Sequence, residues 1–291
     1  MWGVELLGEV LTIMKIMKKQ LKCKLCKSGD LVRVYNFNNR DILKCKNCNL
    51  IFTNFTKKTS LREIYTKEYF DERKEYFGGS RARFSKDLRL IKGYKDSGNL
   101  LDVGCGIGIF LDLAKKSGYE VYGLDVSDFA AKTAKAKFSV NVKVGELERT
   151  NPIKEKFDVI TMFDYFEHVT DPNVVLGRSR SLLKDDGILL ILTIEENALI
   201  TKVARLMYKF GIKWPAERIH PIDHNYYFTE KTLERFLREN GFKIIYEKKK
   251  NLPASDVRGG IVARSIVLFI NTMANIVGQQ DKVLIVAKKA G

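Results

Sequence analysis

The prediction of the fold starts from one run of alternating glycines: Leu100-Leu101-Asp102-Val103-Gly104-Cys105-Gly106-Ile107-Gly108-Ile109-Phe110-Leu111. Apolar residues lead into three glycines at every second position, and apolar residues at helical spacing follow them. This order predicts a buried strand, a glycine turn and the start of a helix. Such a turn gathers backbone N–H groups and the positive end of a helix, where an anionic group of a ligand binds well. Glycines also let a ligand approach closely, because they carry no Cβ.

Two carboxylates accompany this turn. Asp102 stands just before it, and Asp125 ends the next predicted strand, Glu120–Leu124. A carboxylate at the end of the second strand is placed to accept hydrogen bonds from ribose hydroxyls. The spacing Gly-x-Gly-x-Gly differs from that of dinucleotide-binding domains, so an NAD-dependent oxidoreductase is a distant alternative. Together these pieces resemble the class I S-adenosylmethionine-dependent methyltransferases, whose first motif is similar to Asp-x-Gly-x-Gly-x-Gly.

The resemblance continues along the chain. A third strand, Val140–Val144, ends near Glu146, which matches the family's acidic residue for the adenine amino group, although Asp is usual there. After a fourth strand, Phe157–Met162, comes a stretch similar to the Glu-His-Val and Asp-Pro signature of the quinone-biosynthesis-like branch: Phe163-Asp164-Tyr165-Phe166-Glu167-His168-Val169-Thr170-Asp171-Pro172. The resemblance thus implies these S-adenosylmethionine-binding residues: Asp102, Gly104, Cys105, Gly106, Gly108, Asp125, Val126, Glu146, Leu147 and Phe163.

The reaction implied by the resemblance is attack of a substrate oxygen, nitrogen or carbon on the sulfonium methyl group. The positive sulfur already activates this methyl group, so the protein mainly aligns the reactants, which lowers a barrier by roughly 7–11 kcal/mol. A base helps only where the nucleophile must lose a proton. We expect it to be His224, then His168, then Asp164, because imidazole titrates near neutrality and His224 matches a recurrent histidine of the family. Alternatively, His168 fixes its loop through backbone hydrogen bonds, or His220, Asp223 and His224 bind a metal.

Four of the five cysteines form two pairs, Cys23-x-x-Cys26 and Cys45-x-x-Cys48, with 18 residues between them. This spacing is typical of a tetrahedral zinc site in a zinc ribbon. Because all four ligands are cysteines, no coordination position stays open, and we expect the zinc to be structural. The alternative is that the site has lost its zinc or that the cysteines are only buried. The fifth cysteine, Cys105, lies in the glycine turn, so the pattern is not a secreted disulfide framework.

The chain has 291 residues and a net charge of +16, of which residues 1–60 carry 12 Lys or Arg against 4 Asp or Glu. Such an excess favours an anionic partner, namely nucleic acid, a phosphate-bearing acceptor or a membrane surface; a Lys-rich surface without such a partner is the alternative. The sequence has no uninterrupted apolar run of membrane-spanning length and no evident signal peptide. We therefore expect a cytoplasmic protein without a membrane span.

The cysteine ribbon, a helical segment with spaced aromatic residues (within 65–77) and these methyltransferase motifs together resemble a group of small-molecule methyltransferases, many of them near sugar and cell-surface pathways. The predicted acceptor is accordingly a small molecule, such as a sugar, lipid-linked or cell-surface precursor, and the positive net charge favours an anionic one. An RNA methyltransferase is the first alternative, since the ribbon and the charge fit phosphate contacts. No Asn-Pro-Pro-Tyr-like motif follows the fourth strand, however, which disfavours nucleic acid. The second alternative is an adaptor that binds the cofactor without turnover.

The order of strands and helices predicts a doubly wound α/β domain. The resemblance, over residues 23–291, implies a seven-stranded Rossmann-like sheet with an antiparallel last strand, and a cofactor across the carboxyl ends of the first two strands. The expected parts of the chain are an N-terminal extension (1–20), the zinc ribbon (21–58), a helical cap or linker (59–97) and the methyltransferase domain (98–291), with a substrate-side insertion at about 194–228.

Two further helices carry expectations. A helical segment with spaced aromatic residues is implied to lie over the cofactor, with core packing as the alternative: Tyr65, Tyr69, Phe70, Tyr76 and Phe77. Gly78–Gly79 is expected to break the chain after this segment. A long apolar helix over Ile261–Val277 is expected to pack on the body and not to anchor the chain in a membrane.

Overall fold

The computed structural model describes residues 21–56, 60–72, 74–149, 153–251, 253 and 260–291. The helix expected over residues 1–20 and the side chains of Tyr76 and Phe77 lie outside this description.

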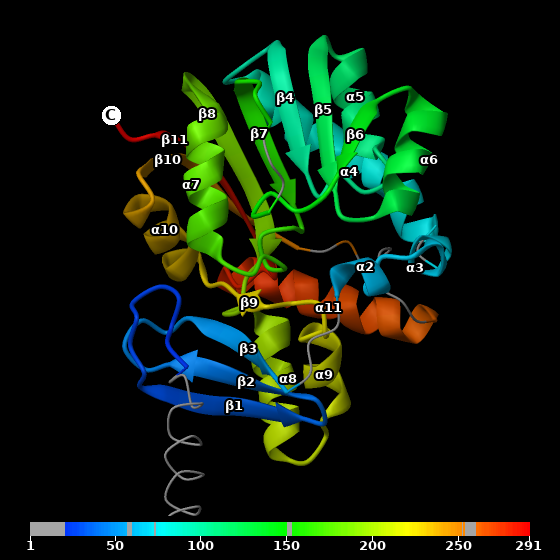
Figure 1. Cartoon of the computed structure of the whole chain (residues 1–291). Helices are drawn as coiled ribbons and strands as arrows, with labels where there is room; N and C mark the ends of the chain where they lie inside the picture. Colours follow the sequence, from blue (N-terminus) through cyan, green and yellow to red (C-terminus); the bar gives the residue numbers. More distant parts are fainter. Residues whose placement is uncertain (1–20, 57–59, 73, 150–152, 252, 254–259) are drawn as a thin grey trace, which may run out of the picture.

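A seven-stranded sheet forms the centre of the molecule (Figure 1). Its strands, in spatial order, are β10 (Phe242–Lys250), β11 (Lys282–Lys289), β8 (Leu183–Ile194), β7 (Phe157–Phe163), β4 (Gly98–Val103), β5 (Tyr119–Asp125) and β6 (Asn141–Val144). Strand β11 runs antiparallel to β10 and β8, and the pairs from β8 to β6 are parallel. The predicted doubly wound sheet with an antiparallel last strand is confirmed.

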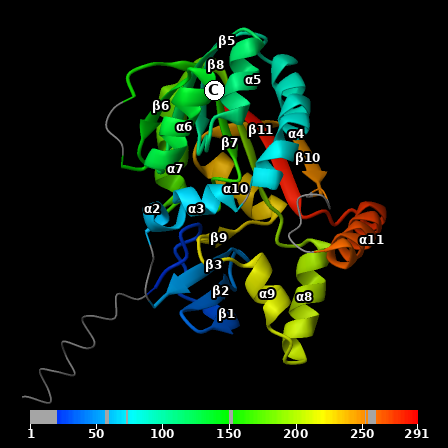
Figure 2. The same ribbon diagram turned by 90° about the vertical axis from the view of Figure 1, so that its right-hand side faces the viewer.

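Helices cover both faces of this sheet (Figure 2). Helices α4 (Lys74–Lys92), α5 (Ile109–Lys116) and α6 (Asp128–Phe138) share one hydrophobic cluster with one face. Helices α7 (Pro172–Leu182) and α10 (Glu230–Glu239) share another cluster with the opposite face. The result is a three-layer domain with the sheet in the middle.

Side-chain caps set the starts of several helices. The Ser127 hydroxyl accepts a hydrogen bond from a backbone N–H at the start of α6, and the Asp171 carboxylate does the same before Pro172 begins α7. Thr229 and Thr232 form a reciprocal capping box on α10. Such caps satisfy N–H groups that have no partner within the helix, and they fix where each helix begins.

A second sheet joins the N-terminal segment to a distant part of the chain. Strands β1 (Leu31–Phe37), β2 (Arg40–Cys45) and β3 (Ile51–Phe55) are antiparallel, and β3 pairs with β9 (Tyr226–Tyr227). Cys23, Cys45, Leu50 and Phe52 belong to the same hydrophobic cluster as α7 and α10. The cysteine ribbon therefore shares its core with the methyltransferase-like sheet.

The short helices α2 (Leu61–Ile64) and α3 (Lys67–Asp71) lie beyond the carboxyl ends of the central strands (Figure 1). After them α4 runs without interruption through Gly78–Gly79, so the expected break is wrong. A glycine costs a helix interior only about 1 kcal/mol relative to alanine, which a long packed helix tolerates.

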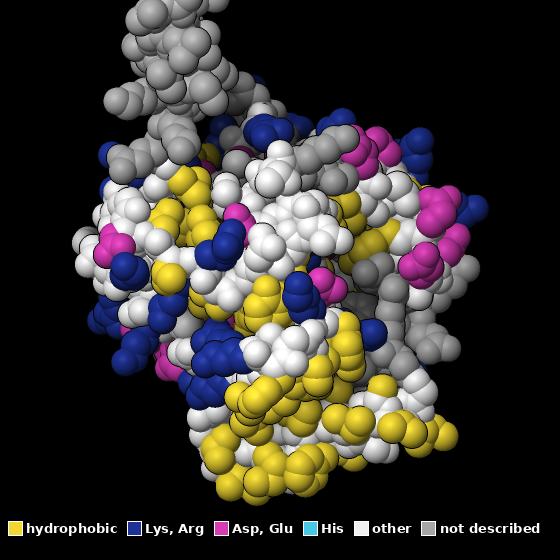
Figure 3. Space-filling model, turned by 90° about the horizontal axis from the view of Figure 1, so that it is seen from below, with side chains coloured by type: hydrophobic (Ala, Val, Ile, Leu, Met, Phe, Trp, Pro, Cys, Tyr) yellow, Lys and Arg dark blue, Asp and Glu magenta, His cyan; other side chains and the backbone are white. Residues whose placement is uncertain are grey.

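Three more helices, α8 (Leu199–Lys209), α9 (Trp214–Ile219) and α11 (Ile261–Val277), lie at the same end of the molecule (Figure 2). Helix α11 lies against α8, yet of its residues only Ala274 is buried. The expected packing of α11 on the body is therefore partial, and its hydrophobic side chains form an exposed area (Figure 3). Across the described residues, no helix has the length and hydropathy needed to cross a membrane.

Candidate active site

A cavity of about 1600 Å³ lies at the carboxyl ends of β4, β5 and β7. The glycine turn forms one wall. Side chains of α2, of α3 and of residues 80–84 in α4 form another. The remaining walls come from the segment after β8 and from α8, α9 and α11. Pockets for one small ligand usually measure about 300–1,000 Å³, so this cavity has room for two ligands side by side.

The glycine turn is built on three left-handed residues, Gly104 (φ 77°), Gly106 (φ 51°) and Gly108 (φ 83°). Side chains other than glycine rarely adopt this region, which explains the alternating pattern. A Cβ on Gly104 would lie 2.7 Å from the Tyr165 ring, and one on Gly108 would lie 2.7 Å from the Ala134 Cβ. At Gly106 the nearest atom is 3.9 Å away, so this glycine faces the open space of the cavity.

Two buried carboxylates stand beside the turn. Asp125 accepts hydrogen bonds from the backbone N–H groups of Gly106 (2.8 Å) and Ser127 (2.9 Å), one on each oxygen. Asp102 accepts a hydrogen bond from the Thr161 hydroxyl at 2.7 Å. Burial raises the pKa of Asp125 and raises that of Asp102 to about 7. Through its two hydrogen bonds Asp125 braces the turn. Because Asp125 also lines the cavity, its remaining lone pairs can accept hydrogen bonds from a ligand.

The structure brings most of the expected cofactor-binding residues to the cavity wall: Asp102, Gly104, Cys105, Gly106, Asp125, Val126, Glu146 and Phe163. The other two, Gly108 and Leu147, are not part of the lining. Gly108 is the residue before α5, and Leu147 is buried in the core. Aromatic side chains of the cap, Tyr65, Tyr69 and Phe70, also line the cavity.

His168 and His224 lie edge to face, with ring centroids 4.7 Å apart. The Nδ1 atom of His168 is 2.8 Å from the backbone carbonyl of Asp223. Because a carbonyl only accepts hydrogen bonds, Nδ1 carries the proton in this arrangement. The Tyr65 hydroxyl donates to the Asp223 carboxylate at 2.9 Å. Three segments therefore meet at this pair of histidines: the residue after α2, the loop after β7, and the insertion between β8 and α10.

Among the described residues, His224 is the candidate base that has an unpaired ring nitrogen. Its Nδ1 atom is buried and makes no hydrogen bond within the described part of the chain. Burial, and then the neighbouring His168, lower the pKa of His224 well below its ordinary value. Asp164 differs: although burial favours its neutral form, Lys282 at 2.6 Å holds the pKa of Asp164 below its usual range. His224 is thus neutral at pH 7, whereas Asp164 is an ion-paired carboxylate.

The alternative metal set His220, Asp223 and His224 does not come together. His220 is fully buried, with Nδ1 2.8 Å from the Ala216 carbonyl and Nε2 3.2 Å from a Glu196 oxygen. A different cluster lies at the cavity: Glu167, His168 and His224 each place one possible ligand atom within 4.8 Å of the other two. This spacing is compatible with a bound cation.

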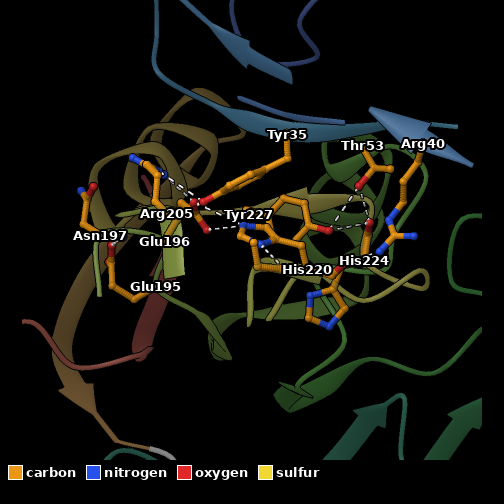
Figure 4. Close-up of polar contacts among 11 residues, drawn as sticks. Tyr35, Arg40, Thr53, Glu195, Glu196, Asn197, Arg205, His220, His224 and Tyr227 are labelled. Atoms are coloured by element: carbon orange, nitrogen blue, oxygen red, sulfur yellow. Dashed lines mark hydrogen bonds and ion pairs between the residues drawn. The ribbon is translucent and has the colours of Figure 1, made fainter. Parts of the chain in front are cut away.

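Residues of the ribbon hold the loop that carries His224 (Figure 4). The Arg40 guanidinium donates to the His220 carbonyl at 2.6 Å, and the Thr53 hydroxyl donates to the His224 carbonyl at 2.7 Å. The Thr53 N–H also donates to the Asn225 carbonyl at 2.9 Å. No local sequence signal marks Arg40 and Thr53, because they meet this loop only through the pairing of β3 with β9.

A buried ion-pair network continues from this loop toward α8 (Figure 4). Arg205 lies 2.8 Å from Glu196, whose other oxygen is 3.2 Å from His220 Nε2. The Tyr35 hydroxyl, from the ribbon, is 3.4 Å from Arg205 Nε. Glu196 lines the cavity, so this network links the ribbon to the cavity wall.

The four cysteines of the ribbon converge. The Sγ atoms of Cys23 and Cys48 are 3.4 Å apart, as are those of Cys26 and Cys45, and all four lie within 4.8 Å of one another. Zn–S bonds of about 2.3 Å give a tetrahedron with S–S edges of about 3.8 Å, which falls in this range. Burial alone raises the pKa of Cys26, but a backbone N–H of Ser28 and the neighbouring thiols lower it to about 7. The donor set and its spacing fit zinc.

Comparison with known proteins gives one family. A model described as "Methyltransferase domain" matches residues 69–247. Ubiquinone biosynthesis O-methyltransferase of Rhodopseudomonas palustris (strain HaA2) is 27% identical over 175 residues, 58% of this chain and 66% of the relative. That of Bradyrhizobium sp. (strain ORS 278) is 27% identical over 163 residues, 54% of this chain and 62% of the relative. The chain thus spans less than two thirds of the length of these relatives.

Solved structures share the fold. Magnesium protoporphyrin IX methyltransferase from Synechocystis PCC 6803 with bound SAH is 16% identical, with a TM-score of 0.55 over 79% of this chain and 98% of its own. A SAM-dependent methyltransferase from Thermotoga maritima, a possible histamine N-methyltransferase, is 20% identical, with a TM-score of 0.55 over 79% of this chain and 100% of its own.

Proposed function

Because the chain belongs to the family of methyltransferase domains, we propose that it transfers a methyl group from S-adenosylmethionine to a small-molecule acceptor with an apolar part, such as a lipid-linked precursor. The observation that carries this proposal is the cavity: the glycine turn and Asp125 stand at one side of it and apolar helices at the other. Its volume of about 1600 Å³ leaves room for an acceptor beside a cofactor.

In this proposal the donor occupies the side at the carboxyl ends of β4 and β5. Asp125 accepts hydrogen bonds from the ribose, Glu146 faces the adenine, and the N–H groups at the start of α5 receive the carboxylate of the donor. Phe163 borders the methyl group, while Gly108 and Leu147 shape this wall from behind. The many carboxylates of the lining suit a sulfonium cation.

The acceptor occupies the side walled by α8 and α11. The apolar residues of this wall are Ile200, Val203, Met207, Ile266, Val267 and Ile270. They favour an acceptor with a hydrocarbon portion, since apolar surface leaves water on binding. The lining also holds basic side chains whose positive charge favours an anionic group on the acceptor: Arg83, Arg218 and Arg264.

The reaction is a direct displacement. A nucleophilic atom of the acceptor forms a bond to the methyl carbon as the carbon–sulfur bond breaks, and the electron pair stays on sulfur to give S-adenosylhomocysteine. His224, neutral and with an unpartnered Nδ1, takes the proton of a hydroxyl or amine nucleophile. His168 orients the loop beside it, and Asp164 with Lys282 contributes fixed charge near the donor. A zinc ion held by the four cysteines would be structural and take no part in the transfer.

The test uses S-adenosylmethionine labelled in the methyl group and two acceptor pools, an organic extract of membranes and total RNA. We expect label in the organic extract, reduced by at least about tenfold when His224 is changed to Gln. An exposed lysine on α6, changed as Lys132→Gln, is the control. Label in RNA would instead support the nucleic-acid alternative, which the charge of +16 favours. Binding of S-adenosylhomocysteine without transfer to either pool would support the adaptor.

A further inference from the structure

The most exposed apolar side chains in the described part of the chain gather in two segments. Among the described residues, every large hydrophobic side chain that is more than half exposed lies in residues 199–219 or in α11. They are Leu206 (57%), Phe210 (78%), Trp214 (63%), Ile261 (83%), Val262 (75%), Ile266 (55%), Leu268 (59%), Phe269 (67%), Ile276 (72%) and Val277 (51%). We name the surface that these residues form the α8–α11 face. Exposed apolar patches of this kind usually mark an interaction site.

Helix α11 contributes most of this face. It has 17 residues and one charged side chain, Arg264, and only Ala274 is buried. A helix that is apolar around most of its circumference is normally covered. Because α11 lies against α8, the exposed residues of both helices form one continuous area (Figure 3).

Positive charge surrounds the α8–α11 face. The segments 199–219 and 261–277 together contain six Lys or Arg and one acidic residue, Glu217. Exposed Lys and Arg stand among the apolar residues: Lys202, Lys209, Lys213, Arg218 and Arg264. Figure 3 shows Lys and Arg side chains beside the hydrophobic area. This combination of apolar side chains and surrounding cations matches an anionic lipid surface, which offers both hydrocarbon and phosphate groups.

We propose that the α8–α11 face docks on the surface of an anionic lipid bilayer, with Phe210, Trp214 and Phe269 in the interfacial layer and the basic residues at the level of the phosphates. The face is also part of the cavity wall. Val203, Trp214 and Ile266 are exposed and line the cavity at the same time. Docking therefore brings the acceptor side of the cavity to the bilayer, where a lipid-linked acceptor can enter without crossing water; this last step rests on the proposed function.

Vesicle binding tests the docking with the full chain and without any cofactor or acceptor. Vesicles of phosphatidylglycerol and phosphatidylcholine in equal parts are compared with vesicles of phosphatidylcholine alone by cosedimentation. We expect binding to the anionic vesicles, weakened at least about tenfold by the double change Phe210→Ser and Phe269→Ser. The matched control is Val174→Ser with Tyr94→Ser, since Val174 and Tyr94 are also exposed but lie elsewhere.

A spectroscopic measurement locates the contact. With Trp2 changed to Phe, Trp214 is the single tryptophan left, and its emission should shift to shorter wavelength only with anionic vesicles. Equal binding to both vesicle types, or binding that survives the Phe210→Ser and Phe269→Ser changes, would overturn the proposal. A dimer in sedimentation equilibrium that these changes dissociate would also overturn it, in favour of a second copy of the chain. Because no methyl donor is present, failure here leaves the proposed transfer untouched.

Discussion

Changing Asp125 to Asn should weaken the binding of S-adenosylhomocysteine strongly while leaving the fold intact. Each oxygen of Asp125 accepts one backbone N–H, from Gly106 at 2.8 Å and from Ser127 at 2.9 Å. Asn turns one of these oxygens into an NH2 group, which then faces an N–H donor. It also removes the charge that would accept the ribose hydroxyls.

The size of the effect follows from these contacts. Hydrogen bonds to a charged group contribute about 1.5–3 kcal/mol each, and about 1.4 kcal/mol corresponds to a tenfold change in affinity. Loss of one such bond to the ligand therefore predicts a dissociation constant about 10- to 150-fold larger. Burial raises the pKa of Asp125, so its charged form is costly in the fold. Removing the charge should accordingly offset much of the stability lost with the backbone hydrogen bond.

Calorimetric titration with S-adenosylhomocysteine measures the change, and thermal unfolding checks the fold. Asp128→Asn is the matched control, because Asp128 is an exposed carboxylate in the first turn of α6. It should bind within about threefold of the unchanged protein, as exposed charges contribute little. If Asp125→Asn binds S-adenosylhomocysteine as tightly as Asp128→Asn does, the proposed contact with the ribose is refuted, even if Asp125→Asn unfolds at a different temperature.

Two further predictions concern burial and metal. Burial raises the pKa of Asp102 to about 7 in the folded protein, so folding favours the protonated carboxyl group. The unchanged protein should therefore lose stability relative to Asp102→Asn as pH rises from about 4 to 7. The expected difference in the free energy of unfolding reaches about 4 kcal/mol. Urea unfolding at pH 5 and pH 8 checks this, and parallel curves would contradict it. Removing the metal with a chelator should lower Tm and impair methyl transfer more than S-adenosylhomocysteine binding, because Arg40 and Thr53 hold the His224 loop and not the glycine turn. Equal loss of both would argue against this coupling.

The sequence predicted the central domain well because its signals are local. The glycine turn needs a left-handed backbone at three alternate positions, and few residues other than glycine adopt it. The segments Val140–Val144 and Phe157–Met162 predicted strands, and the structure has strands at Asn141–Val144 and Phe157–Phe163. Two Cys-x-x-Cys pairs indicated a shared metal site, and their Sγ atoms do converge.

Long-range contacts were not predictable in this way. Strand β9 has two residues and no period of its own, so nothing in Tyr226–Tyr227 indicates a partner in β3. Thr53 and the carbonyl of His224 are separated by 171 residues in the chain. For helix α11 the sequence predicted more burial than the structure shows. Its apolar composition favours burial, but only Ala274 is buried, because burial depends on which surfaces the rest of the chain covers.

The ribbon's position explains why a small cysteine-rich unit precedes this domain. A unit of a few dozen residues buries too little apolar surface to be stable alone, and four thiolates around a zinc ion would supply the missing free energy. In this chain the same unit adds β3 to β9 and donates from Arg40 and Thr53 to the loop of His220 and His224. A loop fixed on one side only by the sheet would move freely at the cavity wall. Anchoring this loop to the ribbon's sheet gives His224 a defined position without a further helix, so the ribbon's effect on activity should pass through this loop.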